Sequence, residues 1–238
     1  MKKAFICGQW EMEFETPANE NFKVSSEKKS YLVHIFSSHM EDISANMTAA
    51  SWTLEGLPHL NSCLDFFGGA GLRSLIVKKL YRPRRHTIIE QDLECLEHLR
   101  RVFPPYIKVR SGDAWKQTGQ RADLVMLDWN SWTILHWPLR RAFLEDVFLR
   151  QPLAVEIFDS SKSYFHVNKA KYSRVLRCRV ETPQDYARGC SAFFLKEIGY
   201  SFAKAAYTPR GAYYLLKSGT QIMEERIVSR GSGGFIWV

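Results

Sequence analysis

The stretch Asp65-Phe66-Phe67-Gly68-Gly69-Ala70-Gly71 joins a short apolar run, CLDFF, to a segment of helical character, GLRSLIVKKL. A chain that leaves a strand and enters a helix here must turn sharply. Glycine permits both the turn and the close approach of a ligand to the backbone. The free N–H groups at the start of the following helix would face such a ligand. The glycines alone leave open a tight strand-to-helix loop that binds nothing.

Outward from this turn, short apolar runs alternate with segments whose apolar residues recur every three or four positions. We expect strands at 63–67, 86–90, 107–112, 122–128, 153–159, 201–208 and 212–218, and helices at 71–80, 93–102, 138–150 and 184–199. Alternating strands and helices imply a parallel sheet covered on both faces. The last two runs imply an antiparallel pair. The predicted fold is α/β, with a doubly wound, mostly parallel seven-stranded sheet and a terminal antiparallel hairpin.

The two ends of the chain differ from this alternating pattern. Residues 16–30 read as a loop, and an amphipathic helix is expected from Ser30 to Leu54, stopped by Gly56 and Pro58. We therefore expect a helical N-terminal extension at 1–58, the α/β domain at 59–218 and a loose C-terminal tail at 219–238.

Composition limits the classes of protein that the chain can represent. The 238 residues contain 33 Lys and Arg against 25 Asp and Glu, a net charge of +8 that favours polyanionic partners such as nucleic acid. The five cysteines form no Cys-x-x-Cys pair, and neither they nor the seven histidines suggest a metal site. No secretory signal or membrane-spanning run is evident, so a cytoplasmic or otherwise intracellular protein without a membrane partner is expected.

Acidic residues end several of the expected strands. Glu90 follows Gly71 by nineteen residues and ends the second strand. In nucleotide-binding sheets, an acid about 20 residues after the glycine turn accepts hydrogen bonds from ribose hydroxyls. Asp113 and Asp128 follow the third and fourth strands. Since ligands of open α/β sheets bind at the carboxyl ends of the strands, we expect these groups to share one site.

Four segments together resemble the successive motifs of class I S-adenosylmethionine-dependent methyltransferases. They are Asp65-x-Phe67-x-Gly69-x-Gly71, Glu90, Gly112-Asp113-Ala114 and the run from Asp123 to Asp128, and the resemblance covers roughly residues 60–218. It implies a Rossmann-like methyltransferase fold that binds S-adenosylmethionine. Gly69 and Gly71 would approach its methionine part, Glu90 the ribose and Asp113 the adenine amino group. The implied cofactor-binding set is Asp65, Phe67, Gly68, Gly69, Gly71, Leu72, Glu90, Gln91, Asp113 and Ala114.

The methyl acceptor is less clearly indicated. The segment Gly71-Leu72-Arg73-Ser74 is similar to one in tRNA guanine-N2 methyltransferases. After the fourth strand the chain reads Asp128-Trp129-Asn130-Ser131-Trp132, which has the acid and the aromatic residues, but not the prolines, of enzymes that methylate exocyclic base amines. Asp128 would face the transferred methyl group. The expected catalytic set is Asp128, Trp129, Asn130 and Trp132.

Within this set, both tryptophans could stack on a base, or instead pack on neighbouring helices. A nucleic-acid acceptor, RNA or DNA, is the preferred interpretation, with a protein partner as one source of target recognition. Two alternatives stay open: a methyltransferase for a small molecule or protein, and a non-catalytic binding or assembly module. The absence of a Pro-Cys pair argues against cytosine-C5 methylation, and Glu156 stands where ribose 2′-O methylation commonly needs a lysine.

Overall fold

The computed structural model describes residues 2–7, 10–15, 43–69, 71–117, 119–128, 132–148, 153–157, 162–209, 211–219 and 223–229. Within this part of the chain, no helix is long and apolar enough to cross a membrane.

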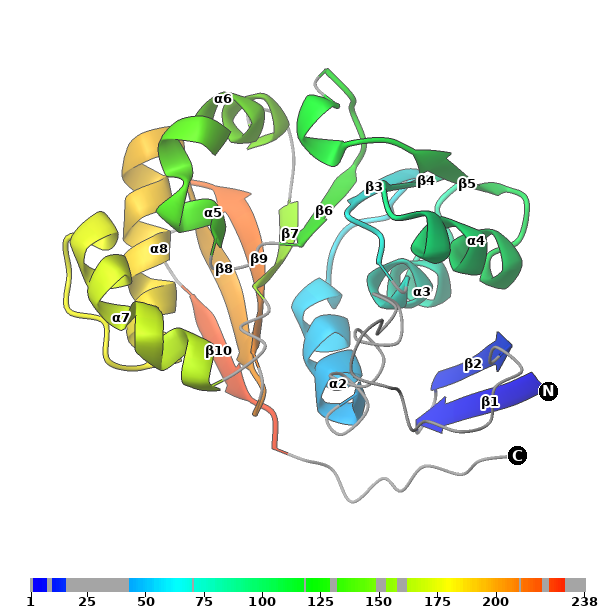
Figure 1. The fold of residues 1–238 in the computed structure, drawn as a ribbon, viewed down its shortest axis with the longest axis horizontal. Coiled ribbons are helices and arrows are strands. Elements are labelled where there is room, and N and C mark those ends of the chain that lie inside the picture. Colours follow the sequence, from blue (N-terminus) through cyan, green and yellow to red (C-terminus); the bar gives the residue numbers. More distant parts are fainter. Residues whose placement is uncertain are drawn as a thin grey trace, which may run out of the picture.

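A sheet of eight strands forms the centre of the fold, in the order β10-β8-β9-β7-β6-β3-β4-β5 (Figure 1). The strands are β3 (Ser62–Phe66), β4 (Arg85–Glu90), β5 (Ile107–Ser111), β6 (Leu124–Asp128), β7 (Leu153–Ile157), β8 (Tyr200–Tyr207), β9 (Ala212–Ser218) and β10 (Glu224–Ile227). From β5 to β7 all neighbours are parallel, whereas β9 is antiparallel to both β7 and β8. The strand order reverses direction between β3 and β6, the place where ligands bind in open sheets of this kind.

Helices cover both faces of the sheet, as expected for a doubly wound fold (Figure 1). One face carries α5 (Trp132–Leu135), α6 (Trp137–Phe148), α7 (Lys162–Leu176) and α8 (Pro183–Ile198). The other carries α2 (Ile43–Leu54), α3 (Leu72–Leu80) and α4 (Leu93–Val102). The sequence sets the ends of α8 clearly: Thr182 and Asp185 form a capping box around Pro183, and Gly199 terminates the helix with a φ of 73°.

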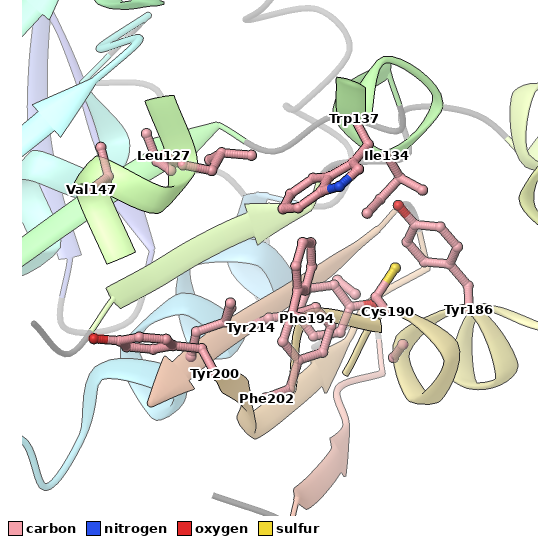
Figure 2. Close-up of a cluster of buried hydrophobic side chains, with 14 of the residues drawn as sticks. Leu127, Ile134, Trp137, Val147, Tyr186, Cys190, Phe194, Tyr200, Phe202 and Tyr214 are labelled. Atoms are coloured by element: carbon pink, nitrogen blue, oxygen red, sulfur yellow. The ribbon is translucent and has the colours of Figure 1, made fainter. Parts of the chain in front are cut away.

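Alternate residues of each strand enter different cores, because successive side chains of a strand point to opposite faces. Leu64 and Phe66 of β3 pack beneath α5 to α8, while Cys63 packs beneath α2 and α3. The first core is strongly aromatic (Figure 2), with Phe202 and Tyr214 stacked at a centroid distance of 4.3 Å. Both positions are closed to water, so these rings fix β8 and β9 against α8.

The structure differs from the sequence-based expectations mainly outside the central strands. The predicted seven-stranded sheet has an eighth strand, since β10 lies within the expected loose tail and pairs in parallel with β8. A further helix, α7, occupies a segment for which none was predicted. Two antiparallel strands, β1 (Lys2–Cys7) and β2 (Trp10–Glu15), form a separate small sheet in the expected extension. Of the helix expected from Ser30, the described part is α2, which packs against β8, β9 and α3.

Candidate functional site

The glycine turn lies where β3 ends and α3 begins, next to the reversal in strand order. The N–H of Gly68 donates to the carbonyl of Ile89 at 3.1 Å, and the N–H of Gly71 donates to the carbonyl of Gly68 at 2.8 Å. Gly69 and Gly71 have φ values of 52° and 80°, in the left-handed region that favours glycine. The turn is therefore tight, hydrogen-bonded to β4 and dependent on glycine for its backbone conformation.

Two of these glycines are also required by packing within the protein. A Cβ atom at Gly68 would lie 2.3 Å from Cγ2 of Ile88, and one at Gly71 would lie 2.5 Å from Cε2 of Phe103. These neighbours follow from the placement of β4 and α4 against the turn. Gly68 and Gly71 thus allow close packing within the protein interior, in addition to the approach of a ligand that the family resemblance implies for Gly68, Gly69 and Gly71.

Phe67 occupies an unusual position for a bulky side chain. Its φ is 62°, a conformation that is strained for any residue with a large side chain and is found preferentially at functional sites. Its carbonyl group accepts a hydrogen bond from the guanidinium of Arg73. Its ring lies 4.9 Å from that of Trp115. The left-handed backbone at Phe67 is thus stabilised by the hydrogen bond from Arg73 and by the contact of its ring with Trp115.

Glu90 connects the end of β4 to the turn. Its Oε2 accepts the N–H of Gly69 at 2.8 Å, and its Oε1 accepts the N–H groups of Gln91 and Asp92 at 2.7 and 2.9 Å. The residue is 7% exposed. A carboxylate offers about four acceptor positions, so these three bonds leave roughly one, on Oε2, for the hydroxyl group of a ligand.

A buried polar network lies beneath the turn, on the α3 side of β3. Asp65 is fully buried; its Oδ2 accepts the hydroxyl of Ser74 at 2.6 Å, and its Oδ1 lies 3.2 Å from Nη2 of Arg73. The Ser74 hydroxyl has a single proton, which it donates to Asp65. The 2.9 Å contact between Ser74 Oγ and Nε2 of His86 is therefore a bond donated by His86.

This network is not a hydrolytic triad, although it contains an acid, a serine and a histidine. In a triad the histidine lies between the other two, whereas here Ser74 does. Ser74 and Asp65 are both 0% exposed, so no substrate can reach the hydroxyl. Burial lowers the pKa of His86 to about 4, and the positive charge of Lys78 adds to the shift. The imidazole is therefore neutral at pH 7, and the network holds the turn in place.

Asp113, after β5, begins the short 3₁₀ helix η2 (Ala114–Lys116). Its Oδ1 accepts the N–H of Trp115 at 3.1 Å, and its Oδ2 lies 3.7 Å from Lys116 Nζ. The Trp115 ring also contacts Phe143 of α6 at 5.0 Å, and the guanidinium of Arg140 lies 4.0 Å above it. These contacts place aromatic and cationic groups from α6 beside the turn, at the same edge of the sheet as Asp113.

The acceptor side of the site is only partly described. Asp128 is the last residue of β6 and pairs with Glu156 of β7, so its backbone is at the expected edge. Trp129 and Asn130 lie outside the described residues, as do the side chains of Asp128, Leu72 and Trp132. Their assigned roles stay predictions.

The structure brings to the turn several residues that are not in the expected site sets: Arg73, Ser74, His86, Trp115, Arg140 and Phe143. A signal existed for the first two. Arg73 and Ser74 stand in a short helix otherwise rich in apolar residues, directly after the glycines. Polar residues there must be bonded if they face the sheet. No comparable pattern pointed to Trp115 and Arg140, which meet only through the tertiary fold.

Comparison with known proteins supports the fold. No protein-family model and no curated protein matches the chain. Among solved structures, Trm1 from Pyrococcus horikoshii with S-adenosyl-L-methionine has a TM-score of 0.53 and 12% identity, covering 76% of this chain and 56% of its own. The mitomycin 7-O-methyltransferase MmcR has a TM-score of 0.48 and 14% identity, covering 78% of this chain and 57% of its own. Human N-acetylserotonin methyltransferase has a TM-score of 0.47 and 20% identity, with coverages of 84% and 62%.

The chain thus spans a little over half of the Trm1 and MmcR chains. The likeness to Trm1 shows that the two chains share an α/β fold; in this chain the parallel strands are followed by the antiparallel pair β8 and β9.

Proposed function

We propose that the protein is an S-adenosylmethionine-dependent methyltransferase. The observation that carries this proposal is the hydrogen bond between the Gly69 N–H and the carboxylate of Glu90. It joins a left-handed glycine turn to a mostly buried acid on the adjacent strand, and it leaves acceptor capacity for a ribose hydroxyl. The class I fold gives this pair its usual place at the carboxyl ends of the strands.

In this proposal the cofactor lies across the strand ends. The adenine would lie by Asp113 and Ala114 after β5, the ribose by Glu90 and Gln91 after β4, and the amino-acid part over the turn after β3. Asp65 would act indirectly, since it is fully buried and bonded to Ser74. It holds the turn from beneath without touching the ligand.

The bound cofactor supplies an electrophilic methyl group on its sulfonium. The chain's part is positioning, because a displacement of about 1 Å at the reacting atoms can reduce the rate 10²-fold. Asp128 ends a buried strand and therefore has a rigid backbone position. We propose that its carboxylate accepts a hydrogen bond from the acceptor group and orients the lone pair of that group. Trp129, Asn130 and Trp132 would surround the acceptor.

Nucleic acid is the acceptor class that we propose. The net charge is +8. Two of the positive charges, Lys108 and Arg110, lie on the edge strand β5. Ile107 is buried and Val109 half-buried, and both pack against α4, while Lys108 and Arg110 alternate with them and are exposed on the opposite face. An exposed cationic edge suits a phosphate backbone.

Calorimetric titration with S-adenosylmethionine tests the cofactor assignment. Wild type should bind, and Glu90→Gln should bind more weakly by about 10-fold or more, since a charged hydrogen bond contributes about 1.5–3 kcal/mol. Glu97→Gln is the matched control, because Glu97 is exposed on the nearby α4. Thermal unfolding of each variant separates a lost ligand contact from a damaged turn.

Absence of binding by folded wild type would contradict the proposal. Equal affinity in wild type and Glu90→Gln would remove Glu90 from the site. Methyl transfer itself is tested by incubating cellular RNA, DNA and protein with methyl-labelled cofactor. In that assay Asp128→Ala should lose activity and keep its affinity for the cofactor.

A further inference from the structure

The edge strand β5 has one face that no helix covers. Lys108 and Arg110 lie on the face of β5 that points away from α4, and both side chains are exposed. The helices on that side of the sheet, α5, α6, α7 and α8, gather over the strands at the other end of the sheet (Figure 1). One face of β5 is therefore open to solvent along its length.

The neighbouring strand β4 extends this surface. Thr87 of β4 pairs with Lys108 and is half-buried. Arg85 lies two residues earlier, on the same face because alternate residues of a strand share a face, and it is exposed. We call the surface formed by Arg85, Thr87, Lys108 and Arg110 the open face. Within the described part of the chain, none of its three cations takes part in an ion pair, so all three can contact an external anion.

An exposed aromatic ring lies at the amino end of the open face. Tyr106 directly precedes β5 and is 58% exposed; among the large apolar side chains exposed in the described part of the chain, it is the only aromatic one. The N–H of Ile107 donates to the carbonyl of Pro104 at 2.9 Å, which closes the turn that presents Tyr106. Arg85 and Tyr106 stand one position before the first residue pair of β4 and β5, so they are neighbours.

The chemistry of this surface fits a single-stranded nucleic acid. Alternate residues of a strand repeat about every 6.6 Å, so Lys108 and Arg110 form a line of positive charge along β5. A line of cations can follow a phosphate backbone, and an exposed ring offers a surface on which a base can stack. Bases in a duplex already stack on one another, so an aromatic ring beside the cations favours a single strand.

We infer that the open face binds single-stranded nucleic acid, with its cations contacting phosphates and Tyr106 stacking on a base. The link to methyl transfer rests on the proposed function. Tyr106 lies roughly 20 Å from the carboxyl edge of the sheet, at about 3.3 Å per residue of β5. A stacked strand advances about 3.4 Å per nucleotide, so about six nucleotides separate the base on Tyr106 from the acceptor base. The acceptor is thus a strand of several nucleotides.

Two ligands separate stacking from charge: a single-stranded RNA of about twelve nucleotides, and inorganic polyphosphate, which has the charges but no bases. Fluorescence anisotropy measures labelled RNA directly and polyphosphate as its competitor. Tyr106→Ala should weaken RNA binding roughly 5-fold or more and change the affinity for polyphosphate less than about twofold. Tyr106→Trp should keep the affinity for RNA, since it keeps an aromatic face.

Two further variants complete the set. Arg85→Gln should weaken the binding of both ligands, because it removes a charge and no stacking surface. Val167→Ala changes an exposed apolar residue of α7, at the other end of the sheet, and should alter neither affinity. Because Tyr106 is exposed, its variants should keep the melting temperature of wild type.

Several outcomes would overturn the inference. They are equal affinity of wild type and Tyr106→Ala for the RNA, an equal loss with polyphosphate, and an equal loss with duplex RNA, whose bases are already stacked. Binding to phosphatidylserine vesicles without binding to RNA would assign the open face to a membrane surface instead. Calorimetry with S-adenosylmethionine separates the two proposals. A protein that binds the cofactor but no RNA refutes only the role of the open face, and one that binds RNA through Tyr106 but no cofactor refutes only the proposed methyltransferase.

Discussion

The carboxylate of Asp65 lies 3.2 Å from the guanidinium of Arg73, and both side chains are buried beneath the glycine turn. The same guanidinium donates to the carbonyl groups of Phe66 and Phe67. One cation therefore balances the buried acid and also binds the backbone of the strained turn. Its removal should affect both the stability of the protein and the shape of the site.

Arg73→Met should lower the free energy of unfolding by about 3–5 kcal/mol, because it leaves a buried carboxylate without its cation. The double variant Asp65→Asn/Arg73→Met should be more stable than the sum of the two single changes predicts, since the uncompensated charge is then absent. Urea denaturation measures all four proteins of this cycle. Additive effects would show that the two residues do not interact energetically.

Gly71→Ala should destabilise the protein by roughly 2–5 kcal/mol, the sum of a left-handed backbone cost and an overpacked contact with Phe103. Gly56→Ala is the control, with a nearly equal φ of 78° and no atom within 4 Å of its Cβ position. It should lose only about 1–2 kcal/mol. Equal losses in the two variants would show that the contact with Phe103 adds nothing to the cost of the substitution at Gly71.

His86 should make stability dependent on pH in the acidic range. Its imidazole takes up a proton near pH 6.5 when the chain is unfolded, but only near pH 4 when folded. The unfolded state therefore binds more protons between these values, and stability falls as the pH decreases from about 6.5 to 4, by roughly 3 kcal/mol in all.

The His86→Gln variant should lack this part of the pH dependence. Its difference from wild type in free energy of unfolding should shrink as the pH is lowered from 7 to 4. His59→Gln, at an exposed position, serves as the control for a general effect of removing a histidine. Parallel pH profiles for wild type and His86→Gln would contradict the assignment of a neutral, buried His86.

The basic edge strand should contribute to nucleic-acid binding. The double variant Lys108→Gln/Arg110→Gln should bind single-stranded RNA more weakly than wild type and with a shallower dependence on salt. Lys171→Gln/Arg174→Gln removes the same charge from exposed positions of α7, at the other end of the sheet (Figure 1). Fluorescence anisotropy at several salt concentrations compares the three proteins. Identical losses in both double variants would indicate an effect of net charge alone.

The central part of the fold could be predicted because its strands are buried apolar runs with clear ends. β3, β4 and β6 end at the glycine turn, at Glu90 and at Asp128, and α8 has both a capping box and a terminating glycine. The spacing of nineteen residues from Gly71 predicts that Glu90 lies near the glycine turn, but it does not predict the hydrogen bond from the Gly69 N–H to the Glu90 carboxylate. The packing reasons for Gly68 and Gly71 could not be predicted, since they depend on how β4 and α4 lie against the turn.

The elements that were not predicted include α7, β10 and β2. The sequences of α7 and β10 have no clear hydrophobic pattern, whereas that of β2 has one. In α7 the buried positions are Phe165, Asn168, Tyr172 and Leu176, at helical spacing, but two of the four carry polar groups. All four residues of β10 are exposed, so this strand depends on pairing with β8. In contrast, WEMEFE in β2 alternates strictly, a period that indicates a strand.

The contact between Gly71 and Phe103 also has a consequence for sequence divergence. Any larger residue at position 71 needs space that the Phe103 ring and the Leu99 side chain now fill. Among homologous chains, we therefore expect position 71 to covary with position 99 of α4 and with position 103 directly after it: a larger residue at the turn should accompany smaller residues at these two positions. The residue allowed at position 71 of the glycine turn thus depends on Leu99 and Phe103, which are not part of the turn.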